Sequence, residues 1–268
     1  MDLRSTAAVL LATSFAAPLA AQVRTSQPPI INIFREFEKP GHAGIHEATE
    51  VRWTALNRQH NYPYTYVALT AVSGPSEVWG VTAYDGLAGF GKGSTWGGDN
   101  AAYQAALSKL SVEDGEHLNN TSAMQAVAVP DASYGAYPDL SKMRVFEVGT
   151  YQVRPGNEAA FTALAKQYAA AMKAGNVATS WRSYQVIAGA PAGTFLVFSS
   201  FPSWDVLEAS QKAAEQAMAT MAPAEGGAFG KAYLETIVSS NNRYFNVNPR
   251  NSLVPKEYSS DPFWAVKP

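Results

Sequence analysis

The sequence has 268 residues, of which 47% are hydrophobic and 16% charged, and its formal net charge is −2. A chain of this length can form two domains, each with a core of its own. The scattered, nearly balanced charges exclude the concentrated basic surface that a nucleic acid partner requires. The lack of cysteine excludes disulfides, thiolate catalysis and iron–sulfur clusters.

The first 21 residues have the pattern of a secretory signal peptide. Arg4 supplies a positive charge, residues 7–17 are apolar, and small residues precede Gln22. We therefore expect export, with a periplasmic or secreted protein after cleavage near Ala21. A disordered or buried apolar N-terminus is the alternative. No other segment approaches the roughly 18 apolar residues of a membrane span, so we expect no transmembrane helix.

A first unit is predicted over residues 29–130. Apolar alternation and helical periodicity place its elements at a strand 30–37, a helix 42–59, strands 64–72 and 77–84, a helix 100–110 and a strand 124–129. The glycine-rich stretch Gly86–Gly98 is predicted to be a flexible loop, with a lid as one role for it. It is not a phosphate-binding loop, because Gly91-Lys92 is followed by glycine instead of Ser or Thr.

A linker (131–142) and a second unit (143–250) follow. The elements expected in this unit are a strand 145–153, a helix from Asn157 to Gly175, strands 181–188 and 194–201, a helix 203–221, a short helix 229–236 and a strand 243–247. Residues 251–268 contain three prolines and no clear period. We expect them to form an extended tail along the surface.

Two turn signals recur at almost the same spacing, which indicates an internal repeat. Pro155-Gly156 follows Pro40-Gly41 by 115 residues, and Ala190-Pro191 follows Gly74-Pro75 by 116. Both units have the order β-α-β-β-α-β of the ferredoxin-like motif, whose helices cover one face of an antiparallel sheet. The predicted fold is therefore α+β, with tandem ferredoxin-like repeats whose bare sheet faces close into an intramolecular pseudo-dimeric barrel.

Over about residues 29–250 the chain resembles the dimeric α+β barrel superfamily, in the fused two-repeat form of NIPSNAP-like proteins. The resemblance rests on the order of the elements and on the spacing of the turn residues. The superfamily includes small monooxygenases, haem-dependent enzymes, isomerases and ligand binders. The resemblance therefore implies the fold and leaves the function open.

All four histidines lie in the first unit. His42 and His46 are four residues apart on the first predicted helix, and Glu50 lies one turn further on, so the three could in principle bind a metal ion. The bland interpretation is that a His pair on a solvent-facing helix has no special role. We favour that interpretation, with His42 and His46 as weak metal candidates.

Two different faces of this first helix could be buried against the sheet. The offset of 115 residues aligns the helix with the apolar stripe Phe161, Leu164, Ala165, Tyr168 and Met172 of the second unit. In that register the buried residues are His46, Thr49, Glu50, Trp53 and Asn57. Buried polar side chains of this kind would indicate a functional site. A shift of one residue instead buries the ordinary stripe Ile45, Ala48, Arg52 and Leu56, with the Arg52 guanidinium reaching solvent. We favour this second register.

Aromatic side chains are concentrated on the middle strands of both units. Most strand aromatics simply pack in a core, but between two facing sheets they could also line an apolar cavity. The candidate ligand-binding residues are His46, Glu50, Trp53, Tyr64, Tyr66, Trp79, Trp181 and Tyr184. The expected partner is a small apolar or aromatic ligand, or other exported protein subunits.

The sequence leaves three classes of function open and does not decide whether the protein is an enzyme. The main hypothesis is an exported non-catalytic ligand-binding, accessory or scaffold protein without a cofactor, because acid–base groups are sparse. The alternative is a small cofactor-independent oxygenase or isomerase with its site inside the barrel. A haem or metal protein is the second alternative, because the resemblance implies haem binding through a histidine as a role found in the superfamily.

Overall fold

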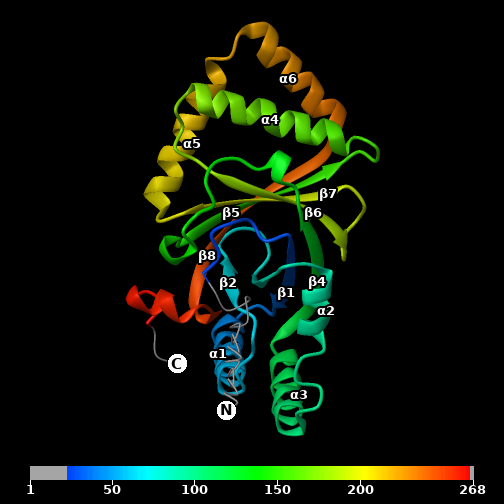
Figure 1. Cartoon of the computed structure of the whole chain (residues 1–268), viewed down its shortest axis with the longest axis vertical. Helices are drawn as coiled ribbons and strands as arrows, with labels where there is room; N and C mark the ends of the chain where they lie inside the picture. Colours follow the sequence, from blue (N-terminus) through cyan, green and yellow to red (C-terminus); the bar gives the residue numbers. More distant parts are fainter. Residues whose placement is uncertain (1–22, 266–268) are drawn as a thin grey trace, which may run out of the picture.

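The computed structural model describes residues 23–265, so the predicted signal peptide at 1–21 lies outside the described residues. Within residues 23–265, eight antiparallel strands form one closed barrel (Figure 1). Long α-helices pack outside it, in two groups. Among the helices described, none combines the length and the apolar character that crossing a membrane requires.

The strands match the sequence expectation most closely where hydrophobic and β-branched residues dominate. In chain order they are β1 (Ile30–Glu38), β2 (Tyr66–Ala71), β3 (Glu77–Tyr84), β4 (Leu118–Ala128), β5 (Val145–Val153), β6 (Trp181–Ala188), β7 (Thr194–Phe201) and β8 (Ile237–Leu253). The α-helices are α1 (Ala43–Gln59), α2 (Leu87–Ser94), α3 (Ala101–Gly115), α4 (Glu158–Ala174), α5 (Trp204–Ala219) and α6 (Pro223–Thr236).

The barrel is closed by hydrogen bonds between the two halves of the chain. Its strand order is β1-β3-β2-β8-β5-β7-β6-β4. β2 pairs with β8, and β4 pairs with β6. The predicted pseudo-dimer of tandem ferredoxin-like sheets closing face to face is therefore wrong, although the fold is α+β as predicted. In a separate sheet, the two edge strands would expose unpaired N–H and C=O groups. Here the edge strands of one half pair with those of the other half, so all eight strands form one continuous sheet.

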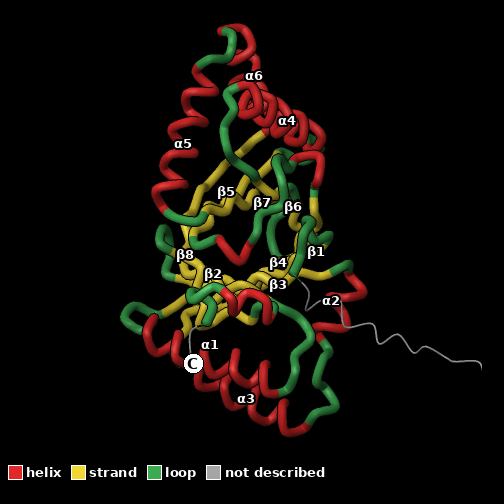
Figure 2. The backbone as a smooth tube through the Cα atoms, turned by 60° about the vertical axis from the view of Figure 1, so that its left-hand side comes forward, coloured by secondary structure: helices red, strands yellow, loops and turns green. Residues whose placement is uncertain are grey.

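The helices lie on two opposite sides of the barrel. α1 and α3 pack side by side next to β1–β4, whereas α4, α5 and α6 cover the sheet formed by β5–β8 (Figure 2). This arrangement creates two kinds of interior. One is enclosed by the barrel, and the other lies between the outer face of the sheet and its covering helices.

Apolar side chains from all eight strands fill the barrel. Ile33, Leu69, Leu196 and Phe245 are each at most 1% exposed, and the Phe245 ring lies 4.7 Å from that of Trp79 between centroids. Such packing supplies most of the driving force for folding. One end of the interior is polar, where the buried Glu77 carboxylate pairs with Arg35, at 2.8 and 2.9 Å, and with Arg243.

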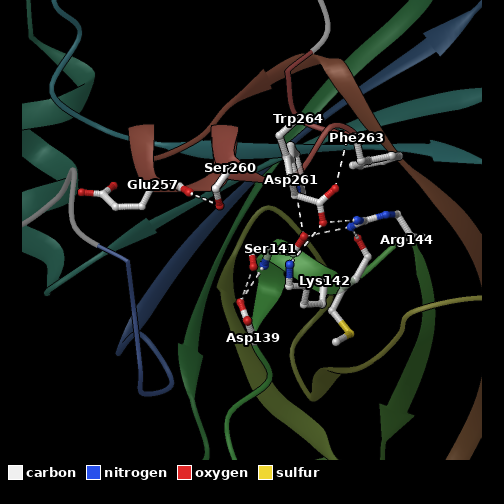
Figure 3. A network of polar contacts seen from close by, with 10 residues as sticks. Asp139, Ser141, Lys142, Arg144, Glu257, Ser260, Asp261, Phe263 and Trp264 are labelled. Atoms are coloured by element: carbon white, nitrogen blue, oxygen red, sulfur yellow. Dashed lines mark hydrogen bonds and ion pairs between the residues drawn. The ribbon is translucent and has the colours of Figure 1, made fainter.

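The C-terminal segment is anchored to the linker between the two halves (Figure 3). Asp261 accepts a hydrogen bond from Arg144 at 2.6 Å, and Trp264 donates its indole N–H to the Ser141 carbonyl at 2.7 Å. The Arg144 guanidinium lies 3.9 Å from the centre of the Phe263 ring. β8 itself extends to Leu253, and a short 3₁₀-helix follows at Lys256–Ser260. These contacts hold the segment against one end of the barrel.

Several segments differ from the sequence expectation. α3 ends at Gly115 instead of residue 110, and α6 begins at Pro223 instead of residue 229. The glycine-rich stretch predicted as a flexible loop contains the helix α2. β4 begins six residues before the expected Met124, and β8 is 17 residues long instead of five. Both strands are extended by pairing with neighbours, β4 with β1 and β8 with β5 and β2. Backbone hydrogen bonds to neighbouring strands therefore hold these polar stretches in the sheet, although their side chains do not alternate between polar and apolar.

Candidate functional site

A cavity of about 230 Å³ lies between the outer face of β5–β8 and the helices α4, α5 and α6. It is larger than the roughly 150 Å³ apolar cavity that binds benzene in another protein. Most of its wall is apolar or aromatic, and a few polar groups point toward it. Its wall includes Glu147, Tyr151, Tyr168, Trp181, Gln211 and Asn242.

Glu147 is the carboxylate of this cavity. It is half-buried on β5, where alternation places it on the same face as Val145 and Gly149. Asn242 on β8 donates to its Oε1 at 3.3 Å, and Gln211 on α5 makes a longer contact to the same oxygen at 3.5 Å. Within the described chain, Oε2 receives no hydrogen bond. One oxygen is therefore positioned by amides while the other is open to a ligand.

The wall around Glu147 is built from stacked aromatic rings. Tyr168 on α4 lies 5.4 Å from Trp181 on β6, and Tyr151 lies 5.6 Å from Phe161, between ring centroids. Phe161 in turn packs on Phe195 at 4.3 Å. Tilted and edge-on arrangements at these separations are favourable, and they leave flat surfaces for another ring.

Burial determines the protonation of the site. It raises the pKa of Glu147 above the usual range for a carboxyl, and the contact with Gln211 partly opposes this effect. Burial also raises the pKa of Tyr151 to about 12 and raises the pKa of Tyr168. The two phenols are therefore neutral hydrogen-bonding groups. Glu147 is therefore the group in the described lining of this cavity that is suited to accept a proton.

A second, smaller cavity of about 120 Å³ lies at one end of the barrel interior. Tyr66, Tyr184 and Arg182 contribute to its wall, and Pro255 and Tyr258 of the C-terminal segment cover it. Among the described residues that line it, none is a carboxylic acid or a histidine. The expected location of the site, inside the barrel, therefore holds a cavity without an evident acid–base group.

The structure distributes the predicted ligand-binding residues over several places. Trp181 lines the Glu147 cavity, whereas Tyr66 and Tyr184 line the barrel cavity. Trp79 packs in the barrel core, and Tyr64 packs against Tyr84 at 4.9 Å, near α2.

The three remaining candidates, His46, Glu50 and Trp53, are on α1. His46 is fully buried, whereas Glu50 and Trp53 are half-buried. None of the three lines either of the two cavities.

The favoured register of α1 is wrong. Ile45 is 53% exposed, whereas His46, Thr49 and Asn57 are buried against the sheet. His46 can be buried because its Nδ1 lies 2.7 Å from an oxygen of Asp114 on α3, which satisfies that nitrogen. The polar register that the offset of 115 residues suggested is the one that the helix adopts.

His42 and His46, the weak metal candidates of the sequence, do not form a pair. His42 lies 3.0 Å from His117, between their Nδ1 atoms, whereas His46 is grouped with Asp114, Glu50 and Glu36. Burial and neighbouring carboxylates raise the pKa values of Glu36 and Glu50. The two histidines thus belong to different clusters, although they share one helix.

Sequence reasoning missed Glu147. A single carboxylate in a strand is ordinarily a solvent-facing residue, and the sequence does not show that three helices cover this face. One indication was available, because Glu147, Gly149 and Tyr151 share a face of β5 with the apolar Val145. A strand with both faces largely apolar is covered on both sides, so a carboxylate on either face is buried.

The comparisons with known proteins show the fold. No family model matches the sequence, and no curated protein matches it. A protein classed as a monooxygenase, from Lactobacillus acidophilus, aligns with a TM-score of 0.52 at 8% identity, covering 86% of this chain and 97% of its own. An anthrone oxidase-like protein aligns with a TM-score of 0.52 at 14% identity, covering 84% and 94%. Chlorite dismutase from Candidatus Nitrospira defluvii, in complex with imidazole, aligns with a TM-score of 0.50 at 12% identity, covering 89% and 97%.

These neighbours correct the main functional hypothesis. They are named as enzymes, which contradicts the expected non-catalytic binder or scaffold and agrees better with the enzymatic alternative. The expectation that no cofactor is needed has no support from them either, because chlorite dismutases are haem proteins.

The described lining of the Glu147 cavity does not fit haem. Haem iron is bound in proteins by His, Cys, Met or Tyr side chains. This lining contains no His or Met, and burial disfavours the phenolate forms of Tyr151 and Tyr168. His46 lines neither of the two cavities. The fold is thus that of the dimeric α+β barrel proteins, with a carboxylate in an aromatic cavity as its own candidate site.

Proposed function

We propose that this protein is a cofactor-independent oxygenase that acts on a small aromatic substrate in the Glu147 cavity. The observation that carries the proposal is the half-buried Glu147 carboxylate, held by Asn242 and surrounded by aromatic rings. Its raised pKa makes it a stronger base than an exposed carboxylate. The enzymatic names of the structural neighbours support the same interpretation.

The proposed substrate is a one- or two-ring aromatic compound with an acidic C–H group next to the ring. The cavity volume of about 230 Å³ sets this size. Tyr168 and Trp181 supply surfaces on which a flat ring packs, and the Tyr151 hydroxyl is available to a carbonyl or phenol oxygen. Apolar walls with few polar groups are the usual form of a small-molecule site.

The reaction begins with transfer of the acidic C–H proton to Glu147. The resulting carbanion is delocalised over the ring, and it reduces O₂ by forming a carbon–oxygen bond. Glu147 returns its proton to the peroxide anion, and the hydroperoxide then loses water to leave a carbonyl group. One CH₂ group and one O₂ thus give one C=O group and one water, and the carboxylate is restored. The aromatic walls keep bulk water away from the carbanion.

Oxygen uptake tests the proposal. Wild-type protein, supplied with hydroxylated one- and two-ring aromatic compounds that carry an acidic CH₂ group next to the ring, should consume O₂ without added metal, haem or flavin. Glu147→Gln should reduce the rate by about a hundredfold or more, the range for loss of a general base. Glu215→Gln, an exposed carboxylate on α5, is the matched control and should leave the rate unchanged.

Two other outcomes would overturn this proposal. Turnover without O₂ consumption that still requires Glu147 would make the protein an isomerase. A Soret band after haem addition, with activity that depends on it, would make the protein a haem enzyme.

Export, like closeness to NIPSNAP-like proteins, remains a prediction from the sequence. We propose that the oxygenase acts outside the cytoplasm after removal of residues 1–21, as the pattern around Arg4 and Ala21 supports. Sequencing the N-terminus of the mature protein tests this, with Gln22 as the expected first residue. An intact N-terminus on the exported protein would contradict it.

A further inference from the structure

A polar cluster beneath α1 gathers three acidic side chains around one histidine. It contains His46 and Glu50 of α1, Glu36 of β1 and Asp114 of α3. His46 is 0%, Asp114 3% and Glu36 6% exposed, and Glu50 is half-buried. Within residues 23–265, none of the three carboxyl groups pairs with a lysine or arginine. Buried carboxylates are costly unless a cation or a proton neutralises them.

His46 presents an unpartnered nitrogen inside this cluster. Its Nδ1 lies 2.7 Å from Asp114 Oδ1. Because an ionised carboxylate only accepts hydrogen bonds, this contact places an imidazole hydrogen on Nδ1 and leaves Nε2 as the nitrogen that faces Glu36. Nε2 is buried without a hydrogen-bond partner in the described structure, and it lies 3.7 Å from Glu36 Oε2. A buried polar atom without a hydrogen-bond partner is unfavourable, and it needs an explanation.

We propose that this cluster is a divalent metal site that joins α1, α3 and β1. His46 Nε2, Glu36 and Glu50 are the ligands, and Asp114 orients the imidazole through Nδ1. A carboxylate on the far nitrogen is the usual partner of a metal-bound histidine, because it fixes the tautomer and the ring orientation. Imidazole with carboxylates suits a first-row transition ion such as Zn²⁺.

The distances agree with this assignment. Zn²⁺ lies roughly 2.0–2.2 Å from nitrogen and oxygen ligands, so two ligands in tetrahedral geometry are roughly 3.3 Å apart. His46 Nε2 and Glu36 Oε2 are 3.7 Å apart. Glu50 lies close to His46 as well, because one nitrogen or oxygen atom each of His46, Glu50 and Asp114 lies within 4.8 Å of the other two.

The other half of the chain supports a special role for these four residues. The residues 115 positions later are Tyr151, Phe161, Ala165 and Phe229, and all four line the Glu147 cavity. Positions that correspond by the offset of 115 residues are thus occupied by apolar or aromatic side chains in the second half and by a histidine with three carboxylic acids in the first half. The nitrogen–carboxylate set is therefore a feature of the first half and not of the repeated fold.

Calorimetric titration of the full chain with Zn²⁺, after dialysis against a chelator, tests the proposal. We expect one ion per chain, and Glu50→Gln should weaken its binding tenfold or more. His42→Gln is the matched control, because His42 contacts His117 outside the cluster, and it should bind like wild type. Glu147→Gln should also bind like wild type, which separates this inference from the proposed oxygenase. Wild-type affinity in Glu50→Gln, or loss of binding in His42→Gln, would overturn it.

An NMR measurement on the wild-type protein tests the proposal without depending on whether the variants fold. In a long-range ¹H–¹⁵N NMR experiment, addition of one equivalent of Zn²⁺ should shift the Nε2 resonance of His46 and leave that of His60 in place. His60 lies near Asn100, away from the cluster. An unchanged His46 resonance would contradict the proposal, whatever the calorimetry shows.

Discussion

Asn242 on β8 donates a hydrogen bond to Oε1 of Glu147 on the neighbouring strand β5, at 3.3 Å. This contact fixes the carboxylate in the cavity between the sheet and the helices α4–α6. Gln211 approaches the same oxygen from α5 at 3.5 Å and also donates to Tyr244 at 2.7 Å. The candidate catalytic group is therefore positioned by two different elements.

The activity should rise with pH. Glu147 accepts a proton only as the carboxylate, and burial raises its pKa above the ordinary value for a glutamate. The lower limb of the pH–rate profile should therefore titrate above that ordinary value. The other titratable groups of this cavity, Tyr151 and Tyr168, stay protonated through the same range because their pKa values are raised. A profile of kcat/KM from pH 4 to pH 9 measures this limb, and a rate that falls with pH would argue against a carboxylate base.

Gln211→Ala should move the same limb to higher pH. The amide stabilises the charged form of Glu147, so its loss raises the pKa further. Gln216→Ala, an exposed change on the same helix, is the control and should leave the profile in place. A shift to lower pH in Gln211→Ala would show that this amide does not stabilise the carboxylate.

Gly149→Ala should weaken substrate binding without unfolding the protein. A Cβ at this position would lie 2.7 Å from Cε2 of the Tyr151 ring and 3.0 Å from Oδ1 of Asn242. The Tyr151 ring must therefore shift, which changes the cavity wall next to Glu147. We expect a several-fold increase in KM with a nearly unchanged Tm. Gly80→Ala, where the nearest atom would be 4.0 Å away, serves as the control.

Phe245→Ala should destabilise the barrel strongly. The side chain is 0% exposed and packs against Trp79 in the interior. Large-to-small changes of a buried phenylalanine cost about 3–5 kcal/mol of the free energy of unfolding. Urea denaturation measures this loss. Val238→Ala, at a side chain 56% exposed on the same strand, should change the stability by no more than about 0.5 kcal/mol.

The strands with strong hydrophobic patterns could be predicted from the sequence. β3, β5, β6 and β7 have the expected bounds, because alternating or continuous apolar residues set their length. The closure of the barrel could not be predicted, because it depends on β2 pairing with β8 and β4 pairing with β6. Hydrogen bonds between backbones leave no residue pattern that identifies the partner.

The candidate sites show the same limit. His46 is buried because Asp114, 68 residues away, bonds to it, and no local pattern contains that contact. Considered without its neighbours, the sequence of α1 therefore favours the apolar register, which the structure does not adopt. Only the comparison with the second half, at an offset of 115 residues, indicated the correct face. Glu147 had only the apolar character of its face of β5 as a signal, because three helices distant in sequence create its cavity.

A crystal structure of Glu147→Gln with a substrate of the wild-type protein tests the central claim most directly. We expect the aromatic ring to pack against the exposed faces of Tyr168 and Trp181, with its acidic carbon about 3–3.5 Å from the amide side chain that replaces the base in this variant. A substrate bound instead in the barrel cavity beside Tyr184, away from residue 147, would contradict it.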